Sequence, residues 1–586
     1  MKYNFTWKKY HRWFGLVLSV FMLVFCVSGI ILNHREAFSG CEVSRKWLPA
    51  SYHIKNFNNG VVKGTVVKNS GSLAISEGFS DSILVYGCAG VFLTDYQLST
   101  WQDFNAGLPK SIDERNVRHL VQARDGSLWC AALRDVYRYD ENAQQWKKVE
   151  LPGNEERIMD VALGKNSIQV VALTRSRIFE ITPIASNIDV SESPSSLASS
   201  AKGGVSEKSP DIFEKKSGGF SEKVGTFWGK YRVEAKIIPA PKNYEPKTTL
   251  FKLVWHLHSG EFFGLPGKLV VDAIALVLIV LSITGILLFI LPYGIRRAKK
   301  VKSEERRVKN SLAAKNRMKR LGKLFAWNMK WHNKIGYVTI VLTLWIAITG
   351  MCLRPPLMVP LVLSKLPQAV GEDGNVWQDK LRAIRWDAVQ GDWLVSTSEG
   401  FLRVDEDFSQ APKMLPDDEC PKLSPMGVTV WESDGKGGWI VGSFRGIYRW
   451  NPVNHKSQIL DYFTNEPCVE TSMIPISDNL ICGYSEDLFD REPMVFDFAK
   501  GVEDAKGQVI NILDEKDAMS DLICETAPMS LWNVALELHV GRCYSPFLGP
   551  LSDLFVFLSG LLITLVLLSG YIISHRRRKK AQARLK

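Results

Sequence analysis

The chain has 586 residues, 46% of them hydrophobic, and a formal net charge of +12 at pH 7. This length excludes a single small domain, and the sharp separation of apolar from polar stretches is typical of an integral membrane protein. Four apolar runs are long enough to cross about 30 Å of hydrocarbon. They cover residues 14–32, 269–291, 335–353 and 554–573, and we expect four transmembrane helices.

The first apolar run follows basic residues, as the core of a signal peptide does. However, it is about twenty residues long, and a signal-peptide core is shorter and ends at small residues. Here the run leads into the sequence Asn33-His34-Arg35-Glu36. We therefore expect a retained membrane anchor.

Basic residues indicate the orientation of the helices. The loop 293–331 carries fourteen Lys and Arg against two Glu, and the tail after His575 carries seven with no acidic residue. Short loops with such an excess stay in the cytoplasm. We expect both termini in the cytoplasm and two large loops, roughly 34–255 and 354–550, on the other side.

Eight of the ten cysteines lie in these two large loops. An oxidising compartment permits disulfides between them, but connectivity cannot be read from a sequence, and small buried side chains are the alternative. The sequence has no zinc-type cysteine or histidine spacing, so we expect no structural metal. The eight are Cys41, Cys88, Cys130, Cys420, Cys468, Cys482, Cys524 and Cys543.

The large loops also contain internal repeats, in which a short apolar strand, a turn and an alternating strand follow one another. Their spacing suits one four-stranded blade, which must stack on neighbours to bury both faces. Three units per loop predict one six-bladed propeller-like domain assembled from both loops, with two incomplete fans as the alternative. Residues 191–224 are rich in Ser, Gly and Lys and are expected to be a linker. The six units are 81–95, 126–140, 166–182, 391–405, 437–451 and 478–498.

The membrane segments are duplicated. At an offset of 321 residues His11 matches His332, and at an offset of 281 residues His258 matches His539. The first offset also aligns Gly15 with Gly336, Ser28 with Thr349 and Gly29 with Gly350, and the second aligns Gly260 with Gly541 and Asp272 with Asp553. We therefore expect a four-helix transmembrane bundle formed by a duplicated two-helix unit, and the fold class is an α+β membrane protein.

Each half has a first helix that leaves the cytoplasm, the rising helix, and a second that returns to it, the descending helix. One histidine lies at the cytoplasmic end of the rising helix, and one lies where the descending helix begins. A single histidine at a membrane boundary is most simply an interfacial or capping residue. Two equivalent pairs favour a cofactor, because a pseudo-twofold axis brings each pair face to face, as six-coordinate haem iron requires. His11 and His332 are then candidate ligands near the cytoplasm, and His258 and His539 near the outer face.

This pattern resembles the PepSY-associated transmembrane helix family. The resemblance rests on His11-Arg12-Trp13-Phe14-Gly15-Leu16, on Leu257-His258-Ser259-Gly260 with Gly264-Leu265-Pro266-Gly267, and on Ser282-Ile283-Thr284-Gly285. It implies a four-pass protein of the bacterial inner membrane with periplasmic loops and two b-type haems. It also implies a ferric reductase linked to siderophore uptake, with haem iron bound through the same four histidines.

Four further residues are secondary candidates. His34 lies about 35 Å along a helix from His11, so it is expected on the outer side, as a replacement ligand or a guide for protons or metal. His256 is expected to face away from His258 in a helix. Asp272 and Asp553 are ionisable groups at membrane depth, which is a functional position by default; Asp553 also suits a helix start, where a carboxylate caps free amides.

The absence of nucleotide-binding and nucleophile motifs limits the possible electron donors. The sequence has no dinucleotide fingerprint, phosphate-binding loop or nucleophile signature, and the cytoplasmic loop is too short for a flavin domain. We expect electrons to come from a quinol or a redox protein and to reach a ferric chelate or an uptake-system protein in the periplasm. The basic loop indicates contact with membrane lipid, and no nucleic acid partner is expected. The alternative function is a non-enzymatic sensor or assembly protein whose propeller binds a ligand or envelope partner.

These predictions divide the chain into nine segments. The first half comprises helix 1–34, repeats 35–190, linker and return 191–255, helix 256–292 and basic loop 293–331. The second half comprises helix 332–356, repeats 357–537, turn and helix 538–575 and basic tail 576–586.

Overall fold

The computed structural model describes most of the chain. The described residues are 7–68, 82–183, 226–228, 231–305, 312–368, 373–424, 426–452, 459–468, 479–510, 522–523 and 527–584. They form two compact units, each drawn from separate parts of the chain. The helical unit contains residues 1–49, 247–368 and 529–586, and the sheet unit contains residues 50–246 and 369–528. The expected linker 191–224 lies outside the described residues.

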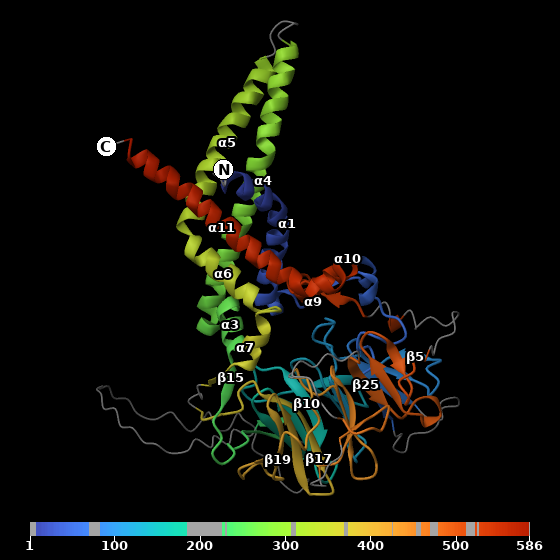
Figure 1. The fold of residues 1–586 in the computed structure, drawn as a ribbon. Coiled ribbons are helices and arrows are strands. Elements are labelled where there is room, and N and C mark those ends of the chain that lie inside the picture. Colours follow the sequence, from blue (N-terminus) through green and yellow to red (C-terminus); the bar gives the residue numbers. More distant parts are fainter. Residues whose placement is uncertain are drawn as a thin grey trace, which may run out of the picture. The chain divides into compact units, whose positions relative to one another are not determined.

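The helical unit is built mainly from long apolar helices. Helix α1 packs against α4 and α11, α4 also packs against α5, and α6 packs against α11 (Figure 1). Two short antiparallel strand pairs, β1 with β28 and β15 with β16, complete the unit. The bounds are α1 Trp7–Asn33, α2 Arg35–Phe38, α3 Leu250–Ser259, α4 Gly264–Glu305, α5 Leu312–Val338, α6 Ile340–Cys352, α7 Met358–Leu363, α9 Leu531–His539, α10 Ser545–Leu548, α11 Ser552–Gln582, β1 Glu42–Val43, β15 Lys247–Thr249, β16 Lys365–Pro367 and β28 Met529–Ser530.

Three helical segments of the described chain are long and apolar enough to cross a membrane: Trp7–Asn33, Glu261–Arg297 and Arg542–Lys579. A fourth span requires counting α5 and α6 together, although they meet at an angle of 68°. No proline breaks this helix pair. Instead, the Thr339 hydroxyl donates to the Ile335 carbonyl at 2.9 Å, and such back-bonding often bends helices. The chain therefore has three or four candidate spans.

The sheet unit contains six small antiparallel sheets, taken here as the first to the sixth sheet in chain order. The first comprises β2 Gly64–Val67, β3 Ile83–Gly87, β4 Gly90–Thr94 and β5 Trp101–Asp103; the second β6 His119–Gln122, β7 Leu128–Ala131, β8 Val136–Asp140 and β9 Gln145–Val149; the third β10 Ile158–Leu163, β11 Val170–Thr174, β12 Ile178–Pro183, β14 Tyr231–Lys236 and β13 Thr226–Trp228. The fourth comprises β17 Leu381–Asp387, β18 Asp392–Thr397, β19 Gly400–Val404 and β20 Lys413–Met414; the fifth β21 Val430–Ser433, β22 Trp439–Ser443, β23 Gly446–Trp450 and β24 Leu460–Asp461; the sixth β25 Ile481–Ser485, β26 Met494–Asp497 and β27 Gly501–Glu503.

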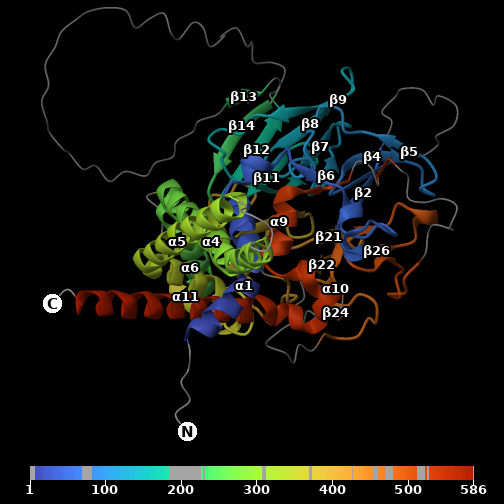
Figure 2. The ribbon, with the colours of Figure 1, turned by 90° about the horizontal axis from the view of Figure 1, so that it is seen from above.

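Each sheet buries apolar side chains against its neighbours in chain order. Figure 2 shows the second sheet between the first and the third. Further apolar clusters join the third sheet to the fourth, the fourth to the fifth and the fifth to the sixth. The sixth sheet then packs on the first, through Phe496 and Val502 against Ile83 and Phe92. Each sheet therefore has both faces covered, which explains why its strands are apolar on both sides.

Two of these contacts join residues from different loops. At the boundary of the third and fourth sheets, the Leu381 amide donates to the Arg175 carbonyl at 2.9 Å. At the boundary of the sixth and first sheets, the Asn59 amide donates to the Phe498 carbonyl at 2.9 Å. The two loops thus contribute to one compact unit.

No disulfide joins the cysteines of the described chain. All nine of them are free thiols, and Cys524 lies outside the described residues. Four of the five free thiols described in the sheet unit, Cys88, Cys130, Cys420 and Cys482, lie in or against its apolar clusters, and Cys130 and Cys482 are fully buried there. Burial raises the pKa of both thiols, which keeps them protonated.

Candidate functional site

Two short helices of the helical unit present one histidine pair. Helices α3 and α9 are capped by Thr249 and Ser530, whose hydroxyls each accept a hydrogen bond from a backbone amide of the first turn. These caps are separated by the same offset that relates His258 to His539. The two histidines lie in the last turns of their helices, and their ring centroids are 6.2 Å apart, with an angle of 51° between the planes. The structure therefore brings His258 and His539 together.

The second pair comes from α1 and α5. The ring centroids of His11 and His332 are 6.3 Å apart, with an interplanar angle of 67°. The two pairs thus have nearly the same separation, although different helices build them. All four rings are half-buried rather than exposed to solvent.

A neighbouring helix holds each of the four rings in the same way. The Nδ1 atom lies 2.8–3.0 Å from a Ser or Thr hydroxyl, and the backbone carbonyl three residues before that hydroxyl also bonds the ring. The residue directly after the Ser or Thr is a glycine. We use the name histidine socket for the hydroxyl, the carbonyl and this glycine together. The sockets are Val566, Ser569 and Gly570 for His11; Leu281, Thr284 and Gly285 for His332; Ile346, Thr349 and Gly350 for His258; and Phe25, Ser28 and Gly29 for His539.

The sockets determine which ring nitrogen carries the proton. A carbonyl oxygen can only accept, so the Nδ1 of His11, 3.0 Å from the Val566 carbonyl, must be the donor. The hydroxyls are already committed as donors, because each one donates to a carbonyl of its own helix at 2.6–2.8 Å. Nδ1 therefore carries the hydrogen in every socket. The neutral Nε2 remains available to bind a metal.

The socket glycines provide the space for the rings. A Cβ added at Gly350 would lie 2.8 Å from the Cε1 of His258, and one at Gly570 would lie 2.9 Å from the Cε1 of His11. The corresponding distances are 3.3 Å at Gly29 and 3.6 Å at Gly285. Side chains larger than hydrogen would push the rings out of at least two sockets.

The secondary candidates lie outside both pairs. The Nε2 of His34 is 2.7 Å from a carboxylate oxygen of Asp272, and Asn33 donates to the other oxygen at 3.1 Å. These hydrogen bonds connect the end of α1 to α4. His256 stacks edge-on against Trp255, with ring centroids 5.3 Å apart.

Asp553 makes a contact equivalent to that of Asp272, with a residue just after the end of a neighbouring helix. It lies in the first turn of α11, and its carboxylate is 3.3 Å from the Arg354 guanidinium, close to the end of α6. Because Arg354 aligns with Asn33 at the offset of 321, both halves connect the end of a rising helix to an aspartate of the descending one. Asp553 is mostly exposed, so this contact contributes little stability.

His575 lies in a stack of aromatic rings rather than beside another histidine. It is nearly parallel to Tyr571 and Tyr337, with centroid distances of 5.8 Å and 6.3 Å. The Arg578 guanidinium lies 3.9 Å from the Tyr337 ring centroid, as expected of a cation–π contact.

The sheet unit has a buried polar cluster of its own, formed by His119, Asp160 and Arg385. Arg385 donates to Asp160 at 2.6 Å and to the Nε2 of His119 at 3.2 Å, while the Nδ1 of His119 donates to the Val161 carbonyl at 2.7 Å. Asp160 is nearly inaccessible. Burial by itself would raise the pKa of Asp160, but Arg385 and His119 outweigh it and hold this pKa below its ordinary value.

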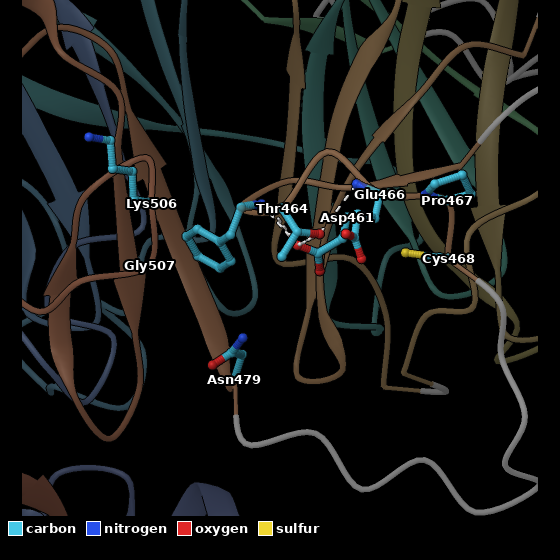
Figure 3. Close-up of a pocket in the computed structure, with 9 residues that line it drawn as sticks. Asp461, Thr464, Glu466, Pro467, Cys468, Asn479, Lys506 and Gly507 are labelled. Carbon is cyan, nitrogen blue, oxygen red and sulfur yellow. Dashed lines mark hydrogen bonds between the residues drawn. The ribbon is translucent and has the colours of Figure 1, made fainter.

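One open cavity of about 460 Å³ lies in the sheet unit, beside β24. Figure 3 shows its lining, which includes Asp461, Cys468, Asn479 and Lys506. The Asp461 carboxylate accepts hydrogen bonds from its own turn, including the Thr464 amide at 3.0 Å. Cys468 and Asn479 also adjoin the stretch 469–478, outside the described residues, so this cavity is not a candidate site.

The Ser569–Gly570 socket and the role of Thr284 were missed by the sequence analysis. The signal was available, because a Ser or Thr followed by Gly occurs in each of the four membrane segments, once in the first three and twice, at Ser559 and Ser569, in the fourth. At the offset of 281, however, Thr284 aligns with Leu565 rather than with Ser569. The second half is four residues longer between its histidine and its hydroxyl, about one helical turn.

The fold and the site define a membrane protein with three or four candidate spans and a set of antiparallel sheets. The chain belongs to the family described as PepSY-associated TM region, whose family model matches residues 4–291 and 299–578. This match confirms the family resemblance predicted from the sequence.

Other comparisons add little. No curated protein matches the chain. Two solved structures of the extracellular domain of BT4673 from B. thetaiotaomicron, described as a one component system and as a hybrid two component system, have TM-scores of 0.29 and 0.28. Their sequence identities are 9% and 10%, and each alignment covers 77% of this chain. This chain spans only 39% of the length of those chains.

Proposed function

We propose that the protein is a b-type haem electron-transfer protein of the bacterial inner membrane that reduces ferric chelates in the periplasm. His11 and His332 would hold one haem, and His258 and His539 the other. The observation that carries this proposal is that the four histidines form two facing pairs. In both pairs each Nδ1 atom is hydrogen-bonded within its socket, which leaves each Nε2 atom to bind a metal.

The separation of the rings fits an iron atom between them. A metal–imidazole nitrogen bond is about 2 Å long and the ring centroid lies about 1 Å further, so two rings on opposite sides of one ion have centroids about 6 Å apart. The observed centroid distances are 6.2 Å and 6.3 Å. Among the described residues, no group of three or more His, Cys, Asp or Glu could hold a metal ion. On this proposal the remaining ligands would come from a macrocycle, and the bound group would supply the change between ferric and ferrous iron.

The placement of the two pairs supports transfer across the membrane. His11 and Ser28, which holds His539, both lie on α1 and are separated by about 25 Å along the helix. An apolar cluster lies between the pairs and includes the buried Leu18, Met22 and Leu278, with the buried hydroxyls of Ser19 and Thr343 among the same helices. A mainly apolar interior of this kind would favour transfer between the two sites over exchange with solvent.

Charge supports the orientation and the partners. The basic loop 293–331 and the basic tail favour cytoplasmic termini in contact with anionic lipid. A quinol or a redox protein would then deliver electrons near His11 and His332, and a ferric chelate or an uptake-system protein would receive them near His258 and His539. The four spans would form a four-helix bundle of two duplicated units.

We also propose that the six sheets are the blades of one periplasmic propeller assembled from both loops, which serves as the substrate or partner module. This proposal is supported by the six apolar clusters, one between each sheet and the next, including the sixth with the first. A propeller of this kind leaves only short, protected strand edges.

The direct test is the absorption spectrum of the purified protein from haem-replete cells. We expect a reduced-minus-oxidised b-type spectrum and two haems per chain, because each histidine pair would ligate one iron atom. A colourless preparation would contradict the proposal. That outcome would favour the alternative of a sensor or assembly protein, in which the sheet unit binds a ligand and the helices serve as an anchor.

The socket glycines give a graded prediction. Gly350→Ala is expected to lower haem content to about one per chain, because its Cβ would lie 2.8 Å from the His258 ring. Gly285→Ala, where the distance is 3.6 Å, is an ordinary contact and is expected to keep two haems. The haem-to-protein ratio of the two purified variants measures the difference, and equal losses in both would show that ring position does not depend on the sockets.

A further inference from the structure

Every histidine socket contains one more acceptor than the ring needs. A backbone carbonyl already lies near Nδ1, for example Phe25 O at 3.1 Å from His539. The hydroxyl of Ser28 adds a second acceptor at 2.9 Å. Nothing in helix geometry requires this hydroxyl, because Ser and Thr are not favoured in helix interiors. All four sockets nevertheless have it, on α1, α4, α6 and α11.

We propose that Ser28, Thr284, Thr349 and Ser569 are positioning residues that lower the reduction potential of the iron held by the histidines. This inference rests on the proposed haem function and concerns residues that do not touch the iron. Each pair of hydroxyls serves one site: Ser28 and Thr349 the outer one, Thr284 and Ser569 the cytoplasmic one.

The physical reason is the electron density on the ligating nitrogen. An Nδ1–H that donates to a good acceptor makes the opposite Nε2 more basic, and outer hydrogen bonds of this kind are known to tune metal sites. A more basic ligand stabilises ferric over ferrous iron, which lowers the potential. A low potential favours passing the electron on to a ferric chelate.

The test uses the full-length protein and a redox titration of its haem absorption. Thr349→Val removes the hydroxyl but keeps the shape of the side chain, and the Ile346 carbonyl remains to orient the ring. We therefore expect two haems per chain, with the potential of one component moved to a more positive value. Ser28→Ala should move the same component, whereas Thr284→Val and Ser569→Ala should move the other.

Matched controls lie on the same helices. Thr343 on α6 is buried and donates only to its own helix, to the Thr339 carbonyl at 3.1 Å. Ser282 on α4 does the same with the Leu278 carbonyl at 2.8 Å. Thr343→Val and Ser282→Ala are expected to leave both potentials unchanged, and Thr349→Ser is expected to restore the wild-type value because it restores the hydroxyl.

The outcomes separate this inference from the function on which it rests. A wild-type protein without haem would overturn the proposed function. A protein with two haems whose potentials are the same in Thr349→Val and Thr343→Val would overturn the positioning role alone. A shift of both components by Thr349→Val would also overturn it, because the hydroxyl contacts only His258 of the four histidines in the described structure.

Discussion

His258→Ala and His539→Ala are each expected to reduce haem content from two per chain to one, and both should lose the same haem. The ring centroids of the two histidines are 6.2 Å apart, so under the proposed function the removal of either one would leave a single protein ligand for an iron atom. His11→Ala and His332→Ala are expected to lose the other haem for the same reason. The measurement is the haem-to-protein ratio of each purified variant, with a redox titration to identify the remaining component.

Double variants make this prediction sharper. Residues that act as one unit are non-additive, so the second substitution in a pair should have no further effect. His258→Ala with His539→Ala should therefore retain one haem, whereas His258→Ala with His11→Ala should retain none. The assignment of pairs would be wrong if the two kinds of double variant gave the same haem content.

His34 and His256 provide the controls. Both are secondary candidates from the sequence, but the structure places His34 against Asp272 and His256 against Trp255. His34→Ala and His256→Ala are each expected to keep two haems. Loss of the outer haem in His34→Ala but not in His539→Ala would show that the ligands do not follow the duplication.

The pairing of histidines could be predicted because duplication conveys three-dimensional information. Two copies of a helix pair related by a pseudo-twofold axis bring equivalent residues together, so the offsets of 281 and 321 already related His258 to His539 and His11 to His332. The sockets could not be predicted in the same way. The helix that holds a given ring depends on packing, and one added helical turn before Ser569 shifts the alignment of the second half.

The sheets likewise contain features that could be predicted from the sequence and features that could not. The strand–turn–strand signal located the β3–β4, β7–β8 and β22–β23 hairpins, because apolar strands joined by glycine or polar turns are local features. Strand β14 of the third sheet could not be found this way. It lies between β12 and β13, pairs with β12 across more than forty intervening residues, and falls in the range 191–255 expected to be a linker and the return to the membrane. The bend at Thr339 was also not predicted, because no proline marks it and Gly336 has a counterpart, Gly15, inside the unbroken helix α1.

Arg385→Met is expected to destabilise the sheet unit by about 3–5 kcal/mol, because it leaves Asp160 as a buried charge without its partner. Arg385 is contributed by the second loop and Asp160 by the first, so this ion pair connects the two halves of the unit. Denaturant unfolding of the full-length protein, followed by the fluorescence of buried tryptophans such as Trp393, measures the loss.

An exposed ion pair at the same boundary is the matched control. Lys165 and Glu406 also come from different loops and are 3.0 Å apart, but both side chains are about half exposed. Exposed pairs of this kind are worth about 0–1 kcal/mol. Lys165→Met is therefore expected to change stability by less than about 1 kcal/mol. Equal effects of the two substitutions would show that the buried cluster does not hold the loops together.

The pH dependence should be weaker in the variant than in the wild type. In the wild type the pKa of Asp160 is lower in the folded than in the unfolded state, so its stabilisation is present above the unfolded pKa of about 4 and is lost as pH falls through the folded pKa. Without Arg385, burial is opposed only by His119 and the Ile384 amide, so the folded pKa of Asp160 is higher than in the wild type. The stabilisation that the wild type gains from Asp160 above about pH 4 should therefore be smaller in the Arg385→Met variant. Parallel curves of unfolding free energy against pH for the two proteins would show that Asp160 does not depend on Arg385 for its charge.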